Sequence, residues 1–399
     1  MNIISFVRVV LIFIGLFLCS SGIAQDDRDV LINLYRANPD NRLDWDIKIT
    51  TIEDWVGVTM VKGRVTELDL RSNKLTLLPE SFGDLTALEE LDLSDNQLTH
   101  LPESLGGLTT LEELDLSENQ LTHLPENLGG LITLVKLDLS DNQLIRLPES
   151  FGGLTVLGEL DLSYNKLTSF PESFGDLIKL EYLNLYKNQI TSLPESFRGL
   201  KALGELDLSY NQLISFPESL GDLITLKKLY LTNNNIISFS ESLVGLTALL
   251  YLNLNDNELT HLPEGFGNLT RLKGLRLNNN ELTHLPESFG NLIKLEYLNL
   301  DDNELTSLPE SFGGLLKLEY LNLYKNPLIR LPESFVDLKE LEILDLSYNK
   351  LTSLPDRFGD LIKLKYLDLY KNPLARLSVS LCNFISDISR VSLHTGVCD

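Results

Sequence analysis

The segment LEELDLSDNQLTHLPESLGGLTT, from Leu88 to Thr110, is one copy of a 23-residue repeat that occurs fourteen times in register from Val65 to Ser386. Counted from the first residue of each repeat, positions 4 and 6 are Leu in all fourteen copies and position 9 is always Asn. A repeat of this length cannot bury its apolar face alone, so the copies must stack on one another. The pattern therefore predicts a solenoid rather than the two or three globular domains that 399 residues would otherwise suggest.

Each repeat begins with the alternation of a short strand. Leu at positions 4 and 6 points inward, while positions 3, 5 and 7 point outward. The rest of the repeat, with apolar positions 11, 14, 18 and 21, supplies the crossover that parallel strands need. Pro at position 15 and Glu or Asp at position 16 predict the start of a short helical turn. We interpret the Gly of position 19 as a turn residue, and the Asn of position 9 as a structural partner for open backbone groups.

The LxxLxLxxN pattern resembles the leucine-rich repeat family, and the resemblance covers about four fifths of the chain. It implies an α/β solenoid with parallel β-strands on the concave face and short helices or turns on the convex side. The LPESFGDL-type return resembles a subgroup that includes intracellular Ras-related scaffolds and many bacterial repeat proteins. The run WVGVTMVKGRVTELDL, from Trp55 to Leu70, resembles the N-terminal cap of plant receptor-kinase ectodomains, whose Trp-x-Gly-Val segment pairs with the first repeat strand. The paired cysteines usual in those caps are missing from residues 26–64.

The sequence divides into four regions. Residues 1–24 are expected to be a signal peptide, because Arg8 is their only charged residue, an apolar run follows it, and small residues precede Gln25. Cleavage near Ala24 predicts a protein that is secreted or held at the cell surface or in the periplasm; an uncleaved anchor is the alternative, although the apolar run is short for a spanning helix. The other regions are an N-terminal cap at 25–64, fourteen repeats at 65–386 and a C-terminal cap at 387–399 with a terminal strand at its start.

Two cysteines remain after cleavage of the signal segment. Cys382 and Cys398 form a candidate disulfide, which suits an exported chain. Two free thiols are the alternative, because sequence does not show whether the two Cβ atoms face each other.

Tyrosine is distributed unevenly along the repeats. Twelve of the thirteen Tyr fall on outward or flanking strand positions, and repeats 1–4 contain none of them. Tyr offers a large contact area and a hydroxyl group at little cost in rotamer entropy, as a recognition surface requires. The alternative is structural, because Tyr also favours strands and stacks on neighbouring strands. We predict a ligand-binding concave face made of Tyr182, Tyr186, Tyr210, Tyr230, Tyr251, Tyr297, Tyr320, Tyr324, Tyr348, Tyr366 and Tyr370.

The formal net charge of −24 argues against nucleic acid or an anionic membrane as the main partner. Position 5 is Asp or Asn in twelve repeats, beginning with Asp69 and Asp92, and neighbouring strands would place these side chains about 4.8 Å apart. This row is either a solvated acidic face or a site for calcium or another cationic ligand, without a metal-loop motif to support the latter. Four of the five His share position 13, which we interpret as a tolerant surface position and not a metal site.

No phosphate-binding loop, nucleophile elbow or zinc motif occurs in the chain. The sequence therefore predicts neither an enzyme nor a cofactor. We expect a module that binds a protein or peptide on its concave face, with no membrane insertion of the mature chain. A surface adhesin or glycan binder is a second possibility. An intracellular Ras-type scaffold is a third, which would require the signal peptide to be wrong.

Overall fold

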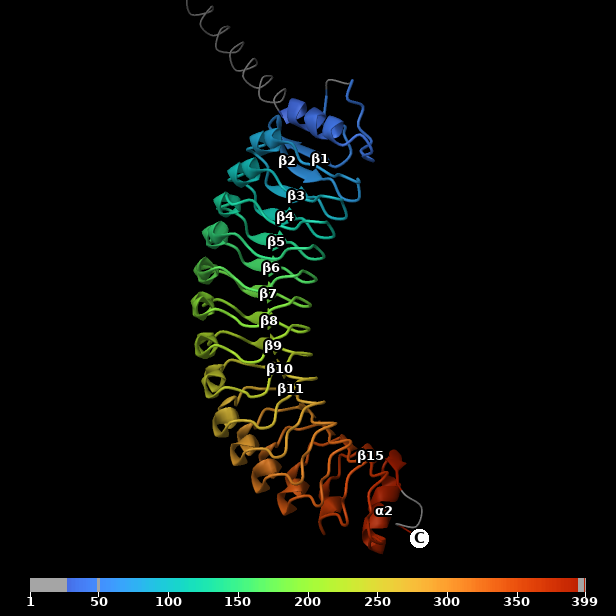
Figure 1. Cartoon of the computed structure of the whole chain (residues 1–399). Helices are drawn as coiled ribbons and strands as arrows, with labels where there is room; N and C mark the ends of the chain where they lie inside the picture. The colour runs from blue at the N-terminus through green and yellow to red at the C-terminus, as the bar shows by residue number, and fades with distance from the viewer. Residues whose placement is uncertain (1–26, 49–50, 394–397, 399) are drawn as a thin grey trace, which may run out of the picture. The chain divides into compact units, whose positions relative to one another are not determined.

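The computed structural model describes residues 27–48, 51–393 and 398, so the predicted signal peptide at 1–24 lies outside the described residues. The chain forms two compact units, an N-terminal unit (Met1–Asn184) and a C-terminal unit (Leu185–Asp399). Each is a stack of repeats in which strands run along one side and 3-10 helices along the opposite side (Figure 1). The predicted α/β solenoid is confirmed, with 3-10 helices as the short return helices. We call the outward side of the strand layer in each unit its strand face.

The N-terminal unit starts with an antiparallel hairpin of β1 (Val58–Val61) and β2 (Arg64–Asp69), as the Trp55–Leu70 resemblance predicts. Lys62 and Gly63 both have positive φ, 53° and 78°, which suits the two-residue turn that joins the strands. From β2 onward every pairing is parallel and in sequence order. The remaining elements are β3 (Glu90–Asp92), β4 (Glu113–Asp115), β5 (Lys136–Asp138), β6 (Glu159–Asp161), β7 (Tyr182–Asn184), η1 (Glu80–Asp84), η2 (Glu103–Gly107), η3 (Leu128–Gly130), η4 (Glu149–Gly153) and η5 (Glu172–Asp176).

The C-terminal unit continues the same pattern, with parallel pairing from β8 to β16. Its last strand, β16, occupies the place where the sequence predicts a terminal strand. The strands are β8 (Glu205–Asp207), β9 (Lys228–Tyr230), β10 (Tyr251–Asn253), β11 (Gly274–Arg276), β12 (Tyr297–Asn299), β13 (Tyr320–Asn322), β14 (Ile343–Asp345), β15 (Tyr366–Asp368) and β16 (Arg390–Ser392). The helices are η6 (Glu195–Gly199), η7 (Glu218–Asp222), η8 (Glu241–Gly245), η9 (Glu264–Asn268), η10 (Glu287–Asn291), η11 (Glu310–Gly314), η12 (Glu333–Asp337), η13 (Phe358–Asp360) and α2 (Val379–Asp387).

The core of each unit consists of the Leu and Phe positions of the repeat. The Leu side chains of positions 4 and 6 are buried throughout the described repeats. Phe at position 18 stacks on its counterpart in the next repeat, with Phe289 and Phe312 ring centroids 6.1 Å apart and nearly parallel. Burial of these side chains stabilises a repeat only when a neighbour covers it, which is why the repeats form a continuous stack.

The Asn of position 9 joins neighbouring repeats through backbone groups, so its structural interpretation is confirmed. Asn303 Nδ2 donates to the carbonyl oxygens of Leu277 (2.9 Å), Leu300 (3.1 Å) and Asp301 (3.2 Å), and its Oδ1 accepts from Leu282 N–H (3.0 Å). The side chain is buried, and it satisfies backbone groups that would otherwise be left open where the strand ends.

The N-terminal cap closes the first repeat. Residues 27–37 are helical, and Val30, Leu31 and Leu34 are buried on one side. The rings of Trp45 and Trp55 stack with centroids 4.8 Å apart. These contacts cover apolar surface that the first repeat would otherwise expose.

At the other end, the sulfur atoms of Cys382 in α2 and Cys398 lie at bonding distance, with 5.6 Å between the Cα atoms. Among the described residues, we find no helix with the length and apolarity that crossing a membrane requires.

Candidate functional site

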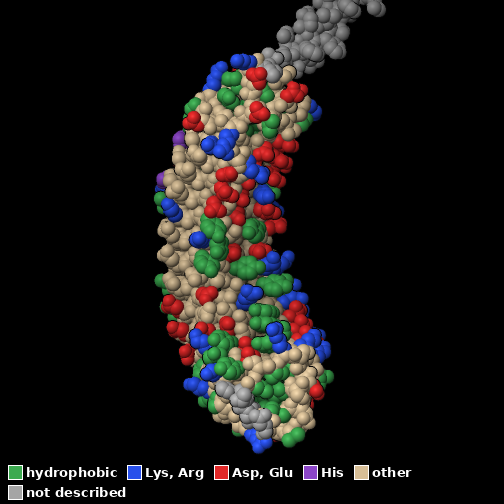
Figure 2. Space-filling model, turned by 90° about the vertical axis from the view of Figure 1, so that its right-hand side faces the viewer, with side chains coloured by type: hydrophobic (Ala, Val, Ile, Leu, Met, Phe, Trp, Pro, Cys, Tyr) green, Lys and Arg blue, Asp and Glu red, His purple; other side chains and the backbone are tan. Residues whose placement is uncertain are grey.

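The strand face of the N-terminal unit is acidic (Figure 2). In β2, β3 and β4 the outward positions 3 and 5 are Glu and Asp in register, so that Glu67, Glu90 and Glu113 form one row. Together with the aspartates beside them, they line a hollow of about 480 Å³. Within the described part of the chain, no group of three or more His, Cys, Asp or Glu has an arrangement suited to a metal ion.

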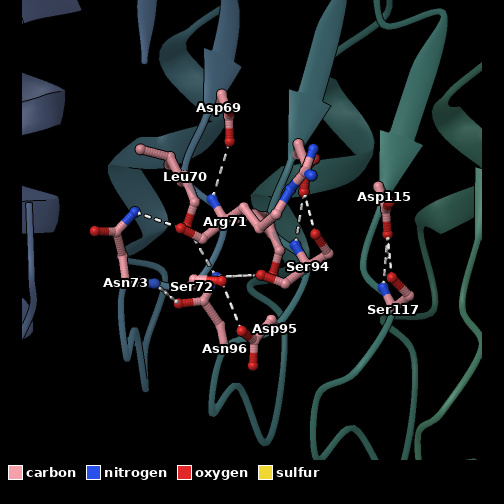
Figure 3. Close-up of polar contacts among 12 residues, drawn as sticks. Asp69, Leu70, Arg71, Ser72, Asn73, Ser94, Asp95, Asn96, Asp115 and Ser117 are labelled. Atoms are coloured by element: carbon pink, nitrogen blue, oxygen red, sulfur yellow. Dashed lines mark hydrogen bonds and ion pairs between the residues drawn. The ribbon is translucent and has the colours of Figure 1, made fainter. Parts of the chain in front are cut away.

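The position 5 aspartates have a structural role that neither sequence interpretation includes. Asp115 Oδ1 accepts hydrogen bonds from the backbone N–H (2.9 Å) and hydroxyl (2.6 Å) of Ser117, and Asp69 accepts from Arg71 N–H (3.2 Å) (Figure 3). The carboxylate thus caps the end of its strand two residues on. Asn does the same, because Asn253 Oδ1 accepts from Asn255 N–H at 3.1 Å. Asp and Asn are therefore equivalent as caps, and they differ in the charge that they give to the strand face.

Desolvation and the crowding of like charges shift the pKa of several carboxyl groups on this face. Desolvation, followed by the charges of Glu67 and Glu113, raises the pKa of Glu90 above its ordinary value. Desolvation also raises the pKa of Asp138. At Asp92 the same desolvation is outweighed by hydrogen bonds from Ser94 and Arg71, so its pKa is lowered. Hydrogen bonds therefore stabilise the charged form of Asp92, whereas the charged forms of Glu90 and Asp138 remain unfavourable on this face.

On the strand face of the C-terminal unit, side chains of the class that includes Tyr are interspersed with acidic and basic ones (Figure 2). Five of the predicted Tyr lie in its strands, at positions 3 or 5, and five lie in the turns that follow the strands. Tyr182 lies in β7 of the N-terminal unit. The strand members are Tyr230, Tyr251, Tyr297, Tyr320 and Tyr366, and the turn members are Tyr186, Tyr210, Tyr324, Tyr348 and Tyr370. We call these ten residues the Tyr surface of the C-terminal unit.

Several of these tyrosines contact one another. Tyr297 and Tyr320 stack face to face, with centroids 4.4 Å apart and planes 7° from parallel. Desolvation, followed by the effect of Tyr297, raises the pKa of Tyr320 to about 12. Tyr348 meets Tyr324 (5.2 Å) and Tyr370 (5.9 Å) edge-on. In the strand row, Ile343 of β14 lies between Tyr320 and Tyr366.

Sequence reasoning missed the backbone state of position 8. In all fourteen repeats this residue has φ between 50° and 59°, the left-handed region that Asn and Asp tolerate and bulky residues avoid. Asp or Asn occupies it in six repeats, but Tyr164, Tyr210 and Tyr348 adopt it as well. Tyr210 packs on Tyr186 with centroids 5.1 Å apart, so the contact between turns offsets part of the strain.

Sequence reasoning also missed a hollow in the Tyr surface of the C-terminal unit. It measures about 420 Å³ and is lined by Tyr230, Tyr251, Leu252, Asn253, Gly274, Arg276 and Tyr297. The guanidinium carbon of Arg276 lies 5.2 Å from the ring centroid of Tyr297. The available signal was the departure from the repeat, because Arg276 stands where Asp or Asn is the rule.

Comparison with known proteins shows similarity to leucine-rich repeat proteins. The family model of the leucine-rich repeat matches most of the chain, at residues 63–121, 109–167, 133–185, 170–213, 224–282, 253–305, 270–328 and 331–374. A leucine-rich repeat protein of Leptospira interrogans is 34% identical over 82% of this chain and 90% of that chain, with a TM-score of 0.65. No protein among the curated ones matches the chain.

Two further solved structures are similar to the chain. The structure of PEPR1 with AtPEP1 is 31% identical with a TM-score of 0.80, over 92% of this chain and 55% of that one, so the chain spans about half of its length. The plant peptide hormone receptor RGFR1, in complex with RGF2, is 28% identical with a TM-score of 0.64 over 85% and 68% of the two chains.

Proposed function

Because the chain belongs to the leucine-rich repeat family, we propose that it is a non-enzymatic module that binds a protein or peptide on its strand face. The observation that carries the proposal is the Tyr surface of the C-terminal unit. A strand face that served only to stay soluble would have no reason to exchange carboxylates for partly exposed aromatic rings. Tyr251 and Tyr348 remain 43% and 46% exposed, which leaves them available to a partner.

The similar receptors support the same proposal. One of them is named as a peptide hormone receptor and was solved with its peptide, RGF2. An extended peptide can run across parallel strands and contact the outward side chains of successive repeats. Tyr at these positions supplies contact area and hydroxyl groups, as rigid aromatic anchors do in other recognition surfaces.

Export of the protein is part of the proposal. Residues 1–24 have the layout of a cleavable signal, so a strand face built for recognition would meet its partner outside the cytoplasm. N-terminal sequencing of the protein recovered from its natural source tests this, with Gln25 as the expected first residue. An intact N-terminus in a cytosolic fraction would favour the scaffold alternative.

A glycan is the less favoured ligand because of the ring geometry. Sugars stack on open aromatic faces, whereas Tyr297 and Tyr320 cover one face of each other. A glycan array probed with the full-length protein is the direct check on this preference.

The test of the proposed function is selection of random displayed peptides on the full-length protein, followed by affinity measurements with three versions of it. One version carries Tyr251→Ala and Tyr348→Ala. The control carries Ile293→Ala and Leu316→Ala, two side chains of comparable exposure (51% and 55%) that follow the 3-10 helices. We expect the tyrosine variant to bind selected peptides at least about tenfold more weakly and the control to bind normally. Equal affinities for all three versions would contradict the proposal.

A further inference from the structure

Position 5 of the repeat follows a rule that two residues of the C-terminal unit break. Asp or Asn at this position caps the end of its strand, as Asp207 does by accepting from Ser209 N–H at 2.8 Å. Tyr230 and Arg276 occupy the same position in β9 and β11. A guanidinium has no acceptor, and a tyrosine carries its hydroxyl at the far end of the ring. Neither residue can therefore cap its strand as Asp and Asn do, so capping does not explain their presence at this position.

A third departure lies between them. At position 3 the strand register places Gly274 between Tyr251 and Tyr297. A Cβ atom on residue 274 would lie 2.8 Å from Cδ1 of Tyr251, so the ring of Tyr251 leans over the glycine. The missing side chain leaves the hollow of about 420 Å³ open between the two rings. The three departures from the repeat thus line one site.

The charge of this site is opposite to that of the acidic strand positions. Arg276 is exposed and forms no salt bridge with any residue that the structure describes. Its neighbours at position 5 in β10 and β12 are Asn253 and Asn299, amides that cap their strands without a negative charge. Carboxylates return at this position only with Asp345 in β14. The lining of the hollow holds the Asn253 amide and Arg276 and no carboxylate, and the nearest acidic strand residues, Glu205 and Asp207, lie beyond Tyr230 in β8.

We propose that this hollow binds an acidic side chain, Asp or Glu, of the partner peptide or protein. The proposal rests on the proposed function and names the chemistry of its partner. From its place over the Tyr297 ring, Arg276 can offer two N–H groups to a carboxylate as a two-point hydrogen bond. The Tyr230 and Tyr251 hydroxyls and the Asn253 amide are further donors around the same space. A side chain bound between the flanking rings would have less water around it, which would strengthen the pairing of charges.

The test uses peptides selected on the full-length protein from a random displayed library, and four versions of the protein. Arg276→Gln removes the charge and keeps most of the side-chain length, and Gly274→Leu fills the hollow. Arg271→Gln is the matched control, because Arg271 is exposed and lies outside the lining of the hollow. Thermal unfolding of each version checks that the fold is kept, and Arg276→Gln alone keeps the test valid if Gly274→Leu fails to fold.

We expect the selected peptides to be enriched in Asp and Glu and to lose about tenfold or more in affinity for Arg276→Gln and Gly274→Leu. Replacing the critical Asp or Glu of a peptide with its amide should weaken binding to the normal protein and have little further effect on Arg276→Gln. Peptides amidated at the C-terminus should bind as well as free ones. A requirement for the free C-terminal carboxylate in place of a side chain would overturn the assignment.

The two proposals fail in different ways. Peptides that bind, depend on Tyr251 and Tyr348, and ignore Arg276→Gln would overturn the acidic side chain and leave the proposed function intact. Selection that yields no binding peptide would overturn both.

Discussion

At the scale of the residue, position 8 shows a requirement that lies in the backbone. Glu118 adopts φ of 52°, is exposed, and makes no side-chain hydrogen bond or ion pair among the described residues. An L-residue with a long side chain is strained there, by about 1–2 kcal/mol relative to relaxed backbone. Asn tolerates this conformation, and it already occupies position 8 at Asn233 and Asn279.

We therefore predict that Glu118→Asn stabilises the protein, by about 0.5–1 kcal/mol. The control is Glu118→Gln, which removes the same negative charge from the acidic unit without a side chain suited to positive φ. The shift in urea unfolding midpoint should be larger for Asn than for Gln. Equal shifts for the two variants would assign the gain to charge alone and contradict the role of the backbone.

At the scale of the element, the 3-10 helices are packed through the Gly of position 19. These glycines, interpreted from the sequence as turn residues, lie inside the 3-10 helices, and none of them has the positive φ that would itself require glycine. A Cβ atom on Gly106 would instead lie 2.1 Å from the carbonyl oxygen of Asn127 in the next repeat. One exception supports the same reason: Val244 replaces the glycine where Gly265 of the next repeat leaves room for it. Gly106 therefore serves the close approach between neighbouring helices. Arg198 and Val336 occupy the same position in η6 and η12, so the requirement does not hold for every repeat.

Gly106→Ala should accordingly destabilise the N-terminal unit by about 1–3 kcal/mol, since backbone must move to admit the methyl group. The adjacent Gly107 offers a matched control in the same helix, because a Cβ atom there would meet nothing closer than 4.0 Å. Gly107→Ala should be neutral or slightly stabilising. Urea unfolding followed by circular dichroism measures both, and comparable losses in the two variants would refute the close-approach explanation.

The fold and the site were predictable from the sequence to different degrees. The structural roles of Leu at positions 4 and 6 and of Asn at position 9 were predictable, because these residues recur in every repeat. The cap made by Asp115, the φ of Tyr348 and the approach of Gly106 to Asn127 depend on atoms of the backbone or of a neighbouring repeat, which no residue pattern displays. The hollow at Arg276 differs from these, because its signal was present as a break in the position 5 rule. That signal could be interpreted only once the structure had shown that Asp or Asn at position 5 caps its strand.

At the scale of the whole molecule, the charge of −24 has a consequence for stability. Several carboxyl groups have a pKa raised in the folded state, chiefly by desolvation: Glu90, Asp138, Asp301 and Asp345. A carboxyl group with a raised folded pKa binds more protons in the folded protein than in the unfolded chain. Stability contributed by such a group increases as pH falls toward its folded pKa. Asp92, with a lowered pKa, acts in the opposite direction, and only at lower pH.

We predict that the urea unfolding midpoint rises as the pH is lowered from neutral toward the raised pKa values of these carboxyl groups, before acid denaturation begins at lower pH. Glu90→Gln should raise the midpoint at neutral pH and reduce the gain on acidification, because it removes a carboxylate that Glu67 and Glu113 repel. Added salt should narrow the difference between the two proteins, since it screens the same repulsion. A midpoint that falls steadily as the pH is lowered from 7 would contradict the prediction, because it would show no gain from the carboxyl groups whose folded pKa is raised. In that case the crowded acidic face would be a net source of stability instead of a cost that the repeat core offsets.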